Sequence, residues 1–333
     1  MKLATDYKII KVSSPLRSKR AWQIESFLLK IFEYGNYSFA KALAGNLAPN
    51  LLNTFFLAQY NNEIIATAGS LYSSANPSIA LLGPVCVKSS FRRNGLAFHL
   101  CSLLLSHLQA QQVKAVYLGV KQDNPARKLY AKLGFNGYNG LVMRKLFCKK
   151  QDFNRRYSPN KNPIIRKMSW QDFPEVSALI CEPAGMYTFD FNKGLYSTRY
   201  AQINKFLPIF PEMMADIEKN NDIANVLINP DQGSITGLVR INCPKSSPQR
   251  HLATLEFFVL DNFLNKSADL INAAILQFRS RVPKGIICYC LECDGKKKNI
   301  LQSLGFVQYS YMPDFVNIRG RLRDVLILKL DRN

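Results

Sequence analysis

The stretch that most constrains the fold is residues 79–112, in which a short basic turn separates two apolar segments. The segment "IALLGPVCV" (79–87) is apolar throughout, which is typical of a central strand buried on both faces. Next, "SSFRRNGLAF" (89–98) brings in two arginines and a glycine, and "LAFHLCSLLLSHLQAQQ" (96–112) predicts a helix. A strand, a glycine-containing turn and a helix direct several backbone N–H groups toward one point at the positive end of the helix dipole. The stretch therefore predicts a phosphate-binding turn, with an ordinary turn carrying solvated arginines as the alternative.

Strand and helix signals alternate through the first 148 residues. Strands and helices are predicted at 7–12 (strand), 18–33 (helix), 53–74 (hairpin), 114–120 (strand), 124–134 (helix) and 140–147 (strand). Strands joined both by hairpins and by crossover helices predict an α/β (α+β) domain with a mixed, mostly antiparallel sheet.

An ordered set of motifs accompanies the basic turn. The turn "RRNGLA" (92–97) fits the signature Arg/Gln-x-x-Gly-x-Gly/Ala. The "GPVCV" strand precedes it, and "VYLGV", "NPARKLY" (124–130) and "LGF" (133–135) follow it. With this set the first half resembles the GNAT superfamily of acyl-CoA-dependent N-acetyltransferases.

The resemblance implies an acetyl-CoA site in the first half and no metal. Backbone amides of the turn would hold the cofactor pyrophosphate, the strand before it would pair with the pantetheine arm, and Asn124 would contact the same arm. Tyr130 would be the general acid that returns a proton to the departing thiolate; the alternative is a tyrosine packed on the sheet. The cofactor-binding residues implied in this way are Val85, Cys86, Val87, Arg92, Arg93, Asn94, Gly95, Leu96, Ala97, Phe98 and Asn124.

The general base is the part of the family pattern that the sequence does not supply. Many members carry a glutamate on the strand before the turn, but residues 79–87 contain no acid. Glu63 and Asp123 are the nearby candidates, and each is more typical of a surface turn. Two functions remain open: an N-acetyltransferase acting on a primary amine by direct attack, and a non-catalytic acyl-CoA-binding module whose basic surface engages nucleic acid or an acidic protein.

The formal net charge of +21 constrains the partners. Residues 1–148 hold 18 Lys and Arg against 5 Asp and Glu, a net +13, and residues 149–333 hold 26 against 18, a net +8. Such charge favours anionic partners, or a solvated basic surface without a specific partner. The acceptor, a small molecule or a protein, and the oligomeric state are not indicated.

The second half repeats the order of the first. Residues 1–148 are predicted to be the acetyltransferase domain, 149–162 a basic linker and 163–333 a second GNAT-like domain. Strand and helix signals recur at 164–180, 224–241 and 253–278, and a strand, a helix, Leu304-Gly305-Phe306 and two strands close the chain. The chain is thus expected to contain two tandem copies of one fold.

The second copy departs from the family at its cofactor turn. "LDNFLNKSADLI" carries Asp261 and Asp269, no glycine, and Lys266 as its one cation. Ile300, Leu301 and Gln302 stand where Tyr130 stands in the first copy, while Glu256 lies on the preceding strand where a general base would be. Because carboxylates repel pyrophosphate, this copy is predicted to be degenerate and to shape the substrate site or add stability. The alternative is that it binds an acyl-CoA in its own way.

The remaining composition points to a cytoplasmic protein without disulfides. No run of eighteen apolar residues exists, and the first residues lack the apolar stretch of a secretory signal. The eight cysteines lie mostly in apolar segments, as buried thiols do in a reducing compartment. Cys290 and Cys293 have a Cys-x-x-Cys spacing, but no second pair or histidine lies near them, so no metal site is expected.

Overall fold

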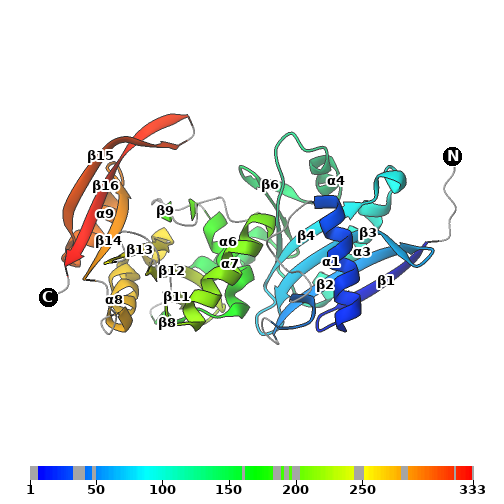
Figure 1. The fold of residues 1–333 in the computed structure, drawn as a ribbon, viewed down its shortest axis with the longest axis horizontal. Helices are drawn as coiled ribbons and strands as arrows, with labels where there is room; N and C mark the ends of the chain where they lie inside the picture. Colours follow the sequence, from blue (N-terminus) through cyan, green and yellow to red (C-terminus); the bar gives the residue numbers. More distant parts are fainter. Residues whose placement is uncertain are drawn as a thin grey trace. The chain divides into compact units, whose positions relative to one another are not determined.

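The computed structural model of the protein contains two compact units, each built around a seven-stranded sheet (Figure 1). It describes residues 7–32, 42–46, 50–159, 162–182, 189–190, 195–196, 203–243, 251–278, 284–318 and 320–331. The first unit comprises residues 1–153, 169–178 and 201–210, and the second comprises the rest of the chain.

The sheet of the first unit has the strand order β1-β2-β3-β4-β5-β7-β6. Neighbouring strands are antiparallel except β4 and β5, which are parallel. The strands are β1 (Lys8–Ser13), β2 (Leu51–Tyr60), β3 (Glu63–Ser73), β4 (Ile79–Val87), β5 (Ala115–Gly119), β6 (Asn136–Asn139) and β7 (Val142–Leu146).

Helices cover both faces of this sheet. The amphipathic helix α1 (Ser18–Phe32) buries Ala21, Ile24 and Leu28 against side chains of β2, β3 and β4. On the other face, α3 (Leu96–Ala110) buries a row of leucines against β2, β3 and β4. The short helix α4 (Ala126–Lys132) follows β5. The basic turn of the sequence therefore connects the central strand β4 to the central helix α3.

The sheet of the second unit repeats this topology, with the strand order β8-β11-β12-β13-β14-β16-β15 and the one parallel pair between β13 and β14. Its helices α8 (Ser267–Phe278) and α9 (Gly295–Ser303) hold the chain positions of α3 and α4. The predicted fold class, two tandem mixed sheets flanked by helices, is confirmed. The strands are β8 (Ile164–Lys167), β11 (Ile223–Asn229), β12 (Ser234–Asn242), β13 (Leu252–Val259), β14 (Gly285–Leu291), β15 (Val307–Ile318) and β16 (Arg321–Asp331).

Some elements were not predicted from the sequence. The strand β6 lies in a polar stretch, and the predicted linker contains the short helix α5 (Lys150–Asn154) followed by a 3-10 turn at Arg155–Tyr157. Between β8 and β11 lie the helices α6 (Phe173–Cys181) and α7 (Ile203–Glu218) and the two-residue strands β9 (Phe189–Asp190) and β10 (Leu195–Tyr196). No helix in the described part of the chain is both long and apolar enough to cross a bilayer. The domain limits at 148 and 163 stay a prediction.

Candidate functional site

The parallel strands β4 and β5 pair over only part of their length. Their register joins Ile79 to Ala115, Ala80 to Val116 and Leu81 to Tyr117, and no further pair follows. Strand β4 continues for six residues beyond Leu81 while still paired with β3 on its other side. An open stretch of strand edge is thus left in the middle of the sheet.

The backbone of Val85 and Val87 faces this open edge. The Lys88 N–H donates to the Ile65 carbonyl across β3, at 2.8 Å between N and O. Because hydrogen-bonded and non-hydrogen-bonded pairs alternate along antiparallel strands, the next hydrogen-bonded pair is Cys86 with Thr67. The N–H and C=O groups of Val85 and Val87 consequently point away from β3, where an extended ligand can pair with them.

A β-bulge lies on β4 where it separates from β5, with Gly83 and Pro84 opposite the single β3 residue Gly69. The β3–β4 register shifts between Ala68 and Ser70, opposite the segment from Leu82 to Val85. A Cβ at Gly69 would lie 2.6 Å from the Phe55 ring and 2.9 Å from the Gly83 carbonyl oxygen, so only glycine fits there. Bulges bend a strand and redirect its edge, and this one is placed to turn β4 away from β5.

The turn between β4 and α3 has two residues in the left-handed region. Arg93 has φ +66° and Gly95 has φ +75°. Nothing lies within 4 Å of a Cβ built on Gly95, so glycine is needed there for its backbone conformation and not for space. The Asn94 amide donates to the carbonyls of Phe91 and Arg92, which fixes the shape of the turn from within.

The amides of this turn are free to bind an anion. Within the described residues, the backbone N–H groups of residues 93 to 98 donate to no acceptor, and the first bond of α3 runs from His99 N–H to the Gly95 carbonyl. The turn residues are exposed except Leu96, which is buried, and Ala97, which is half-buried. Unpaired amides at the start of a fifteen-residue helix form an anion site of the kind that binds phosphate.

Arg92 and Asn124, two further predicted cofactor residues, also have structural contacts. The Arg92 Nε donates to the Val87 carbonyl at 3.1 Å, so this guanidinium ties the turn to the open edge of β4. The Asn124 Oδ1 accepts from the N–H of Ala126, the first residue of α4, at 2.9 Å. This leaves the Asn124 amide nitrogen as its available donor, because no hydrogen bond from that nitrogen to a described residue is found.

Tyr130 lies on α4, buried, with 8% of its surface exposed. Burial, and then the nearby thiols of Cys101 and Cys86, raise the pKa of the Tyr130 phenol well above its ordinary value. These thiols come from α3 and from the open part of β4, which locates the phenol beside that strand segment. No hydrogen-bond partner for its hydroxyl is found among the described residues. At neutral pH Tyr130 therefore carries a proton that it can donate.

The Cys86 thiol is a poor nucleophile. It lies 3.2 Å from the Thr67 hydroxyl, and burial raises the pKa of Cys86 to about 11. Since the thiolate is the reactive form, Cys86 contributes packing and backbone to the site.

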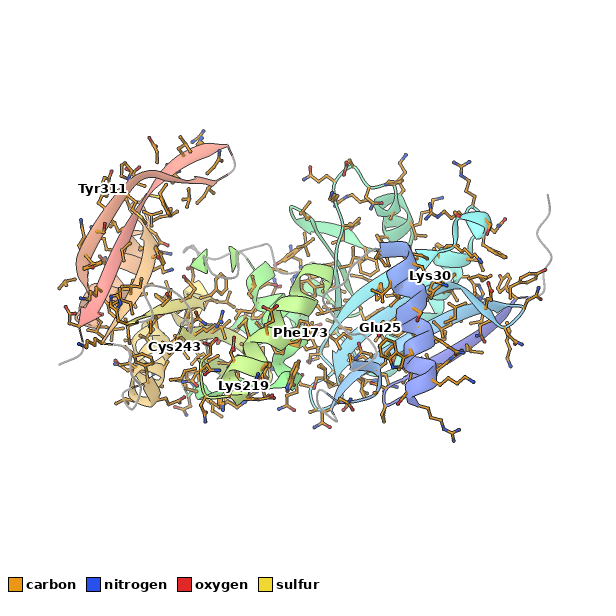
Figure 2. The ribbon with its side chains drawn as sticks, in the orientation of Figure 1. Glu25, Lys30, Phe173, Lys219, Cys243 and Tyr311 are labelled. Carbon is orange, nitrogen blue, oxygen red and sulfur yellow. The ribbon has the colours of Figure 1, made fainter. Side chains whose placement is uncertain are left out.

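The acids singled out in the sequence are exposed, whereas another acid of the first unit is buried. Glu63 is exposed and pairs with Lys88, 3.2 Å from Oε2 to Nζ, and Asp123 is exposed. Glu25 on α1 is instead buried at 3% exposure on the face that packs against the sheet (Figure 2). Sequence reasoning missed this residue, although its place beside Ile24 and one turn from Ala21 and Leu28 was a readable signal.

Comparison with known families agrees with this geometry. The sequence model of the "Acetyltransferase (GNAT) family" matches residues 19–135, from the start of α1 to the residue before β6. This stretch is a GNAT acetyltransferase domain. This match supports an acyltransferase activity in the part of the chain that it covers.

Solved structures of acetyltransferases are similar to about half of the chain at low identity. The ribosomal-protein-S5-alanine acetyltransferase from Vibrio fischeri has a TM-score of 0.43 at 13% identity, over 52% of this chain and 94% of that one. A putative acetyltransferase from Salmonella typhimurium, solved with its cofactor acetyl-CoA, has a TM-score of 0.41 at 16% identity, over 51% and 93%. No curated protein sequence matches the chain.

The second unit lacks the GNAT anion turn. A 3-10 segment, η4 (Asp261–Lys266), leads into α8, and no residue of this turn has a positive φ. Asp261 pairs with Lys296, and Lys266 pairs with Asp269. With its amides in a 3-10 turn and carboxylates beside it, this segment presents no counterpart of the 93–98 donors.

A buried ion pair joins α9 to the part of β13 that lies beyond its pairing with β14. Like β4 and β5, β13 and β14 pair over three residues only. The Lys297 Nζ lies 2.6 Å from the Glu256 Oε1, with 0% and 8% of the two side chains exposed. Burial lowers the pKa of Lys297, but Glu256 together with Cys288 and Cys290 raises it above its ordinary value. Glu256, which the sequence placed where a base would stand, is thus engaged in an ion pair.

Proposed function

We propose that the protein transfers an acetyl group from acetyl-CoA to a primary amine, with the chemistry in the first unit. The observation that carries the proposal is the combination of six free amides at 93–98 with the open edge of β4 directly before them. An anionic group at the amides and an extended arm along Val85 to Val87 match the pyrophosphate and pantetheine of one molecule. Arg92 and Arg93 add positive charge at the rim of the turn.

The acetyl donor fits the residues present. Amides of residues 93 to 98 would hold the pyrophosphate, main-chain groups of Val85 and Val87 would pair with the amides of the pantetheine arm, and the Asn124 Nδ2 would donate to the same arm. The thioester of acetyl-CoA supplies the activated acyl carbon. Its leaving group then lies at the segment of β4 that Tyr130 adjoins.

In the proposed reaction an amine nitrogen attacks the thioester carbonyl, a C–N bond forms and the C–S bond breaks. The Tyr130 phenol donates its proton to the departing sulfur, and the proton lost by the amine leaves to water. The raised pKa of Tyr130 suits this role, because the phenol stays protonated until the thiolate develops.

Substitution of Gly95 tests the donor site. Gly95→Val forces a β-branched residue into φ +75° and is expected to weaken acetyl-CoA binding by about tenfold or more, because several amides lose their common direction. Gly95→Asn is expected to retain most of the affinity, since asparagine tolerates the left-handed region. Calorimetric titration of acetyl-CoA into the full chain measures both.

The control is Gly140→Val, which changes another glycine with positive φ and open space around it, on the turn before β7. Its acetyl-CoA affinity should equal that of the wild type. Undiminished binding to Gly95→Val, or no binding to the wild type, would contradict the donor site.

A further inference from the structure

The C-terminal hairpin of the second unit is much longer than its counterpart in the first. Strands β15 and β16 have 12 and 11 residues, whereas β6 and β7, which hold the same places in the first sheet, have 4 and 5. Strand β14 pairs with β16 only as far as the pair of Leu291 with Val325. In the described part of the chain, the tip of the hairpin (residues 315–323) thus extends past the end of β14 as a two-stranded ribbon (Figure 1). The fold that the two units share does not require this extension.

Exposed apolar side chains are concentrated on this hairpin. Phe315 is 49% exposed and Leu322 is 56% exposed, and both belong to the tip. Apolar side chains gathered in one exposed place mark a surface that contacts a partner or a membrane. Of the eleven large apolar side chains that are exposed among the described residues, five lie on the hairpin, at Val307, Tyr309, Tyr311, Phe315 and Leu322.

The charged residues of the tip are all positive. Residues 315–323 contain three arginines and no acid. Arg321 and Arg323 are exposed, and neither forms an ion pair with a described residue. Asp324, at the base of the tip, accepts instead from the Tyr311 hydroxyl and from the Asp314 N–H. The tip therefore favours an anionic partner.

Among anionic partners, a phospholipid surface fits these side chains best. Nucleic acid binds arginine through its phosphates and stacks its bases on aromatic rings, but it offers little to an aliphatic side chain such as Leu322. A second copy of the chain would bring another net charge of +21. At a bilayer interface, apolar side chains enter the acyl boundary while guanidinium groups stay among the lipid phosphates. A ribbon that enters end-on presents both of its faces, so its apolar residues need not lie on one side.

We propose that the tip of the β15–β16 hairpin binds an anionic membrane surface. Phe315 and Leu322 enter the interface, and Arg321 and Arg323 lie at the lipid phosphates. The attachment is peripheral, and it does not depend on the acetyl transfer proposed for the first unit. Its consequence for that reaction is to bring the enzyme to acceptors at a membrane surface.

The test is co-sedimentation of the full chain with lipid vesicles. Vesicles of phosphatidylserine and phosphatidylcholine in equal parts are compared with vesicles of phosphatidylcholine alone, and the wild type is expected to bind the anionic vesicles more tightly. Leu322→Ser should bind them about tenfold more weakly, for loss of one inserted leucine side chain. The double variant Arg321→Gln/Arg323→Gln should lose about fivefold in affinity for each charge removed.

Matched controls lie elsewhere in the same sheet. Val307→Ser removes an apolar side chain that is 60% exposed, at the start of β15 and away from the tip. Lys167→Gln/Lys284→Gln removes two exposed charges, one on the opposite edge strand β8 and one just before β14, at the end of the sheet away from the tip. Both controls should bind vesicles as the wild type does. Because Leu322 is exposed, the thermal midpoint of Leu322→Ser should also equal that of the wild type.

Three results would overturn the proposal. The first is equal binding of the wild type to the two kinds of vesicle, or binding to neither. The second is an equal loss of binding in the tip variants and in their controls, which would assign the attraction to net charge alone. The third is a different occupant: a single-stranded RNA oligonucleotide, followed by fluorescence anisotropy, or a second copy of the chain, followed by sedimentation velocity, that binds through Leu322 when the vesicles do not.

Discussion

Replacing Tyr130 with phenylalanine is expected to lower kcat for acetyl transfer by about 10²- to 10⁴-fold, the usual contribution of a positioned general acid. Tyr130 is 8% exposed and its ring packs edge-on against Phe135, at 6.0 Å between centroids. Phenylalanine keeps this packing and removes only the hydroxyl. Acetyl-CoA affinity should therefore stay at the wild-type value while turnover falls, which calorimetry and release of free CoA measure together.

A matched control is Tyr72→Phe. Tyr72 is 3% exposed, belongs to the same core cluster as Tyr130, and also has a pKa raised by burial. Its hydroxyl lies 3.5 Å from the His107 Nε2. Tyr72 itself pairs with Ala80, in the part of the sheet where β4 is still paired with β5. Tyr72→Phe should leave kcat unchanged. Equal turnover by Tyr130→Phe and wild type would show that the leaving thiolate takes its proton from another source.

Replacing Lys297 with methionine is expected to destabilise the second unit by about 3–5 kcal/mol, because it leaves the Glu256 carboxylate buried without its cation. The side chain of Lys297 is completely buried, and its ammonium also lies over the Phe257 ring at 5.4 Å from the centroid. Hydrogen–deuterium exchange along β13 and β14, read against urea concentration, reports the stability of this unit separately from the first.

Lys296→Met is the control for this change. The neighbouring Lys296 pairs with Asp261 at 3.3 Å, but both side chains are about half exposed, so its removal should cost no more than about 1 kcal/mol. The double variant Glu256→Leu/Lys297→Met removes both charges and should recover most of the lost stability. If Lys297→Met were as mild as Lys296→Met, the ion pair would not be holding α9 to β13.

The sequence predicted the central strand, the basic turn and the helix of the first unit because their signals are local. Alternating hydrophobic segments and the positions of Gly95 and Asn124 can be read within one window of residues. The same holds for the second copy, in which the strand order follows from the repeated succession of elements. Strand β6 was not predicted, because its four residues do not alternate between apolar and polar side chains.

Contacts between residues far apart in the chain could not be predicted. Lys297 lies in a run of three lysines that reads as a solvated turn, and only the fold brings it to Glu256, 41 positions earlier. The β-bulge on β4 opposite Gly69 can be recognised only once β3 and β4 are in register. Glu25 could be placed on the apolar face of a helix, but only the fold shows that this face packs against the strands around Cys86.

The short pairing between β4 and β5 also affects how firmly the first unit holds together. Three residue pairs connect the β1–β4 half of its sheet to β5, β7 and β6. A donor paired with Val85 and Val87 supplies the missing strand, so its binding stabilises the folded state. At a donor concentration of roughly 100 times the dissociation constant, the free energy of unfolding rises by about 2.7 kcal/mol. Amide exchange at Val85 and Val87 should slow as acetyl-CoA is added. The folded enzyme would then persist longer when the concentration of its own substrate is higher.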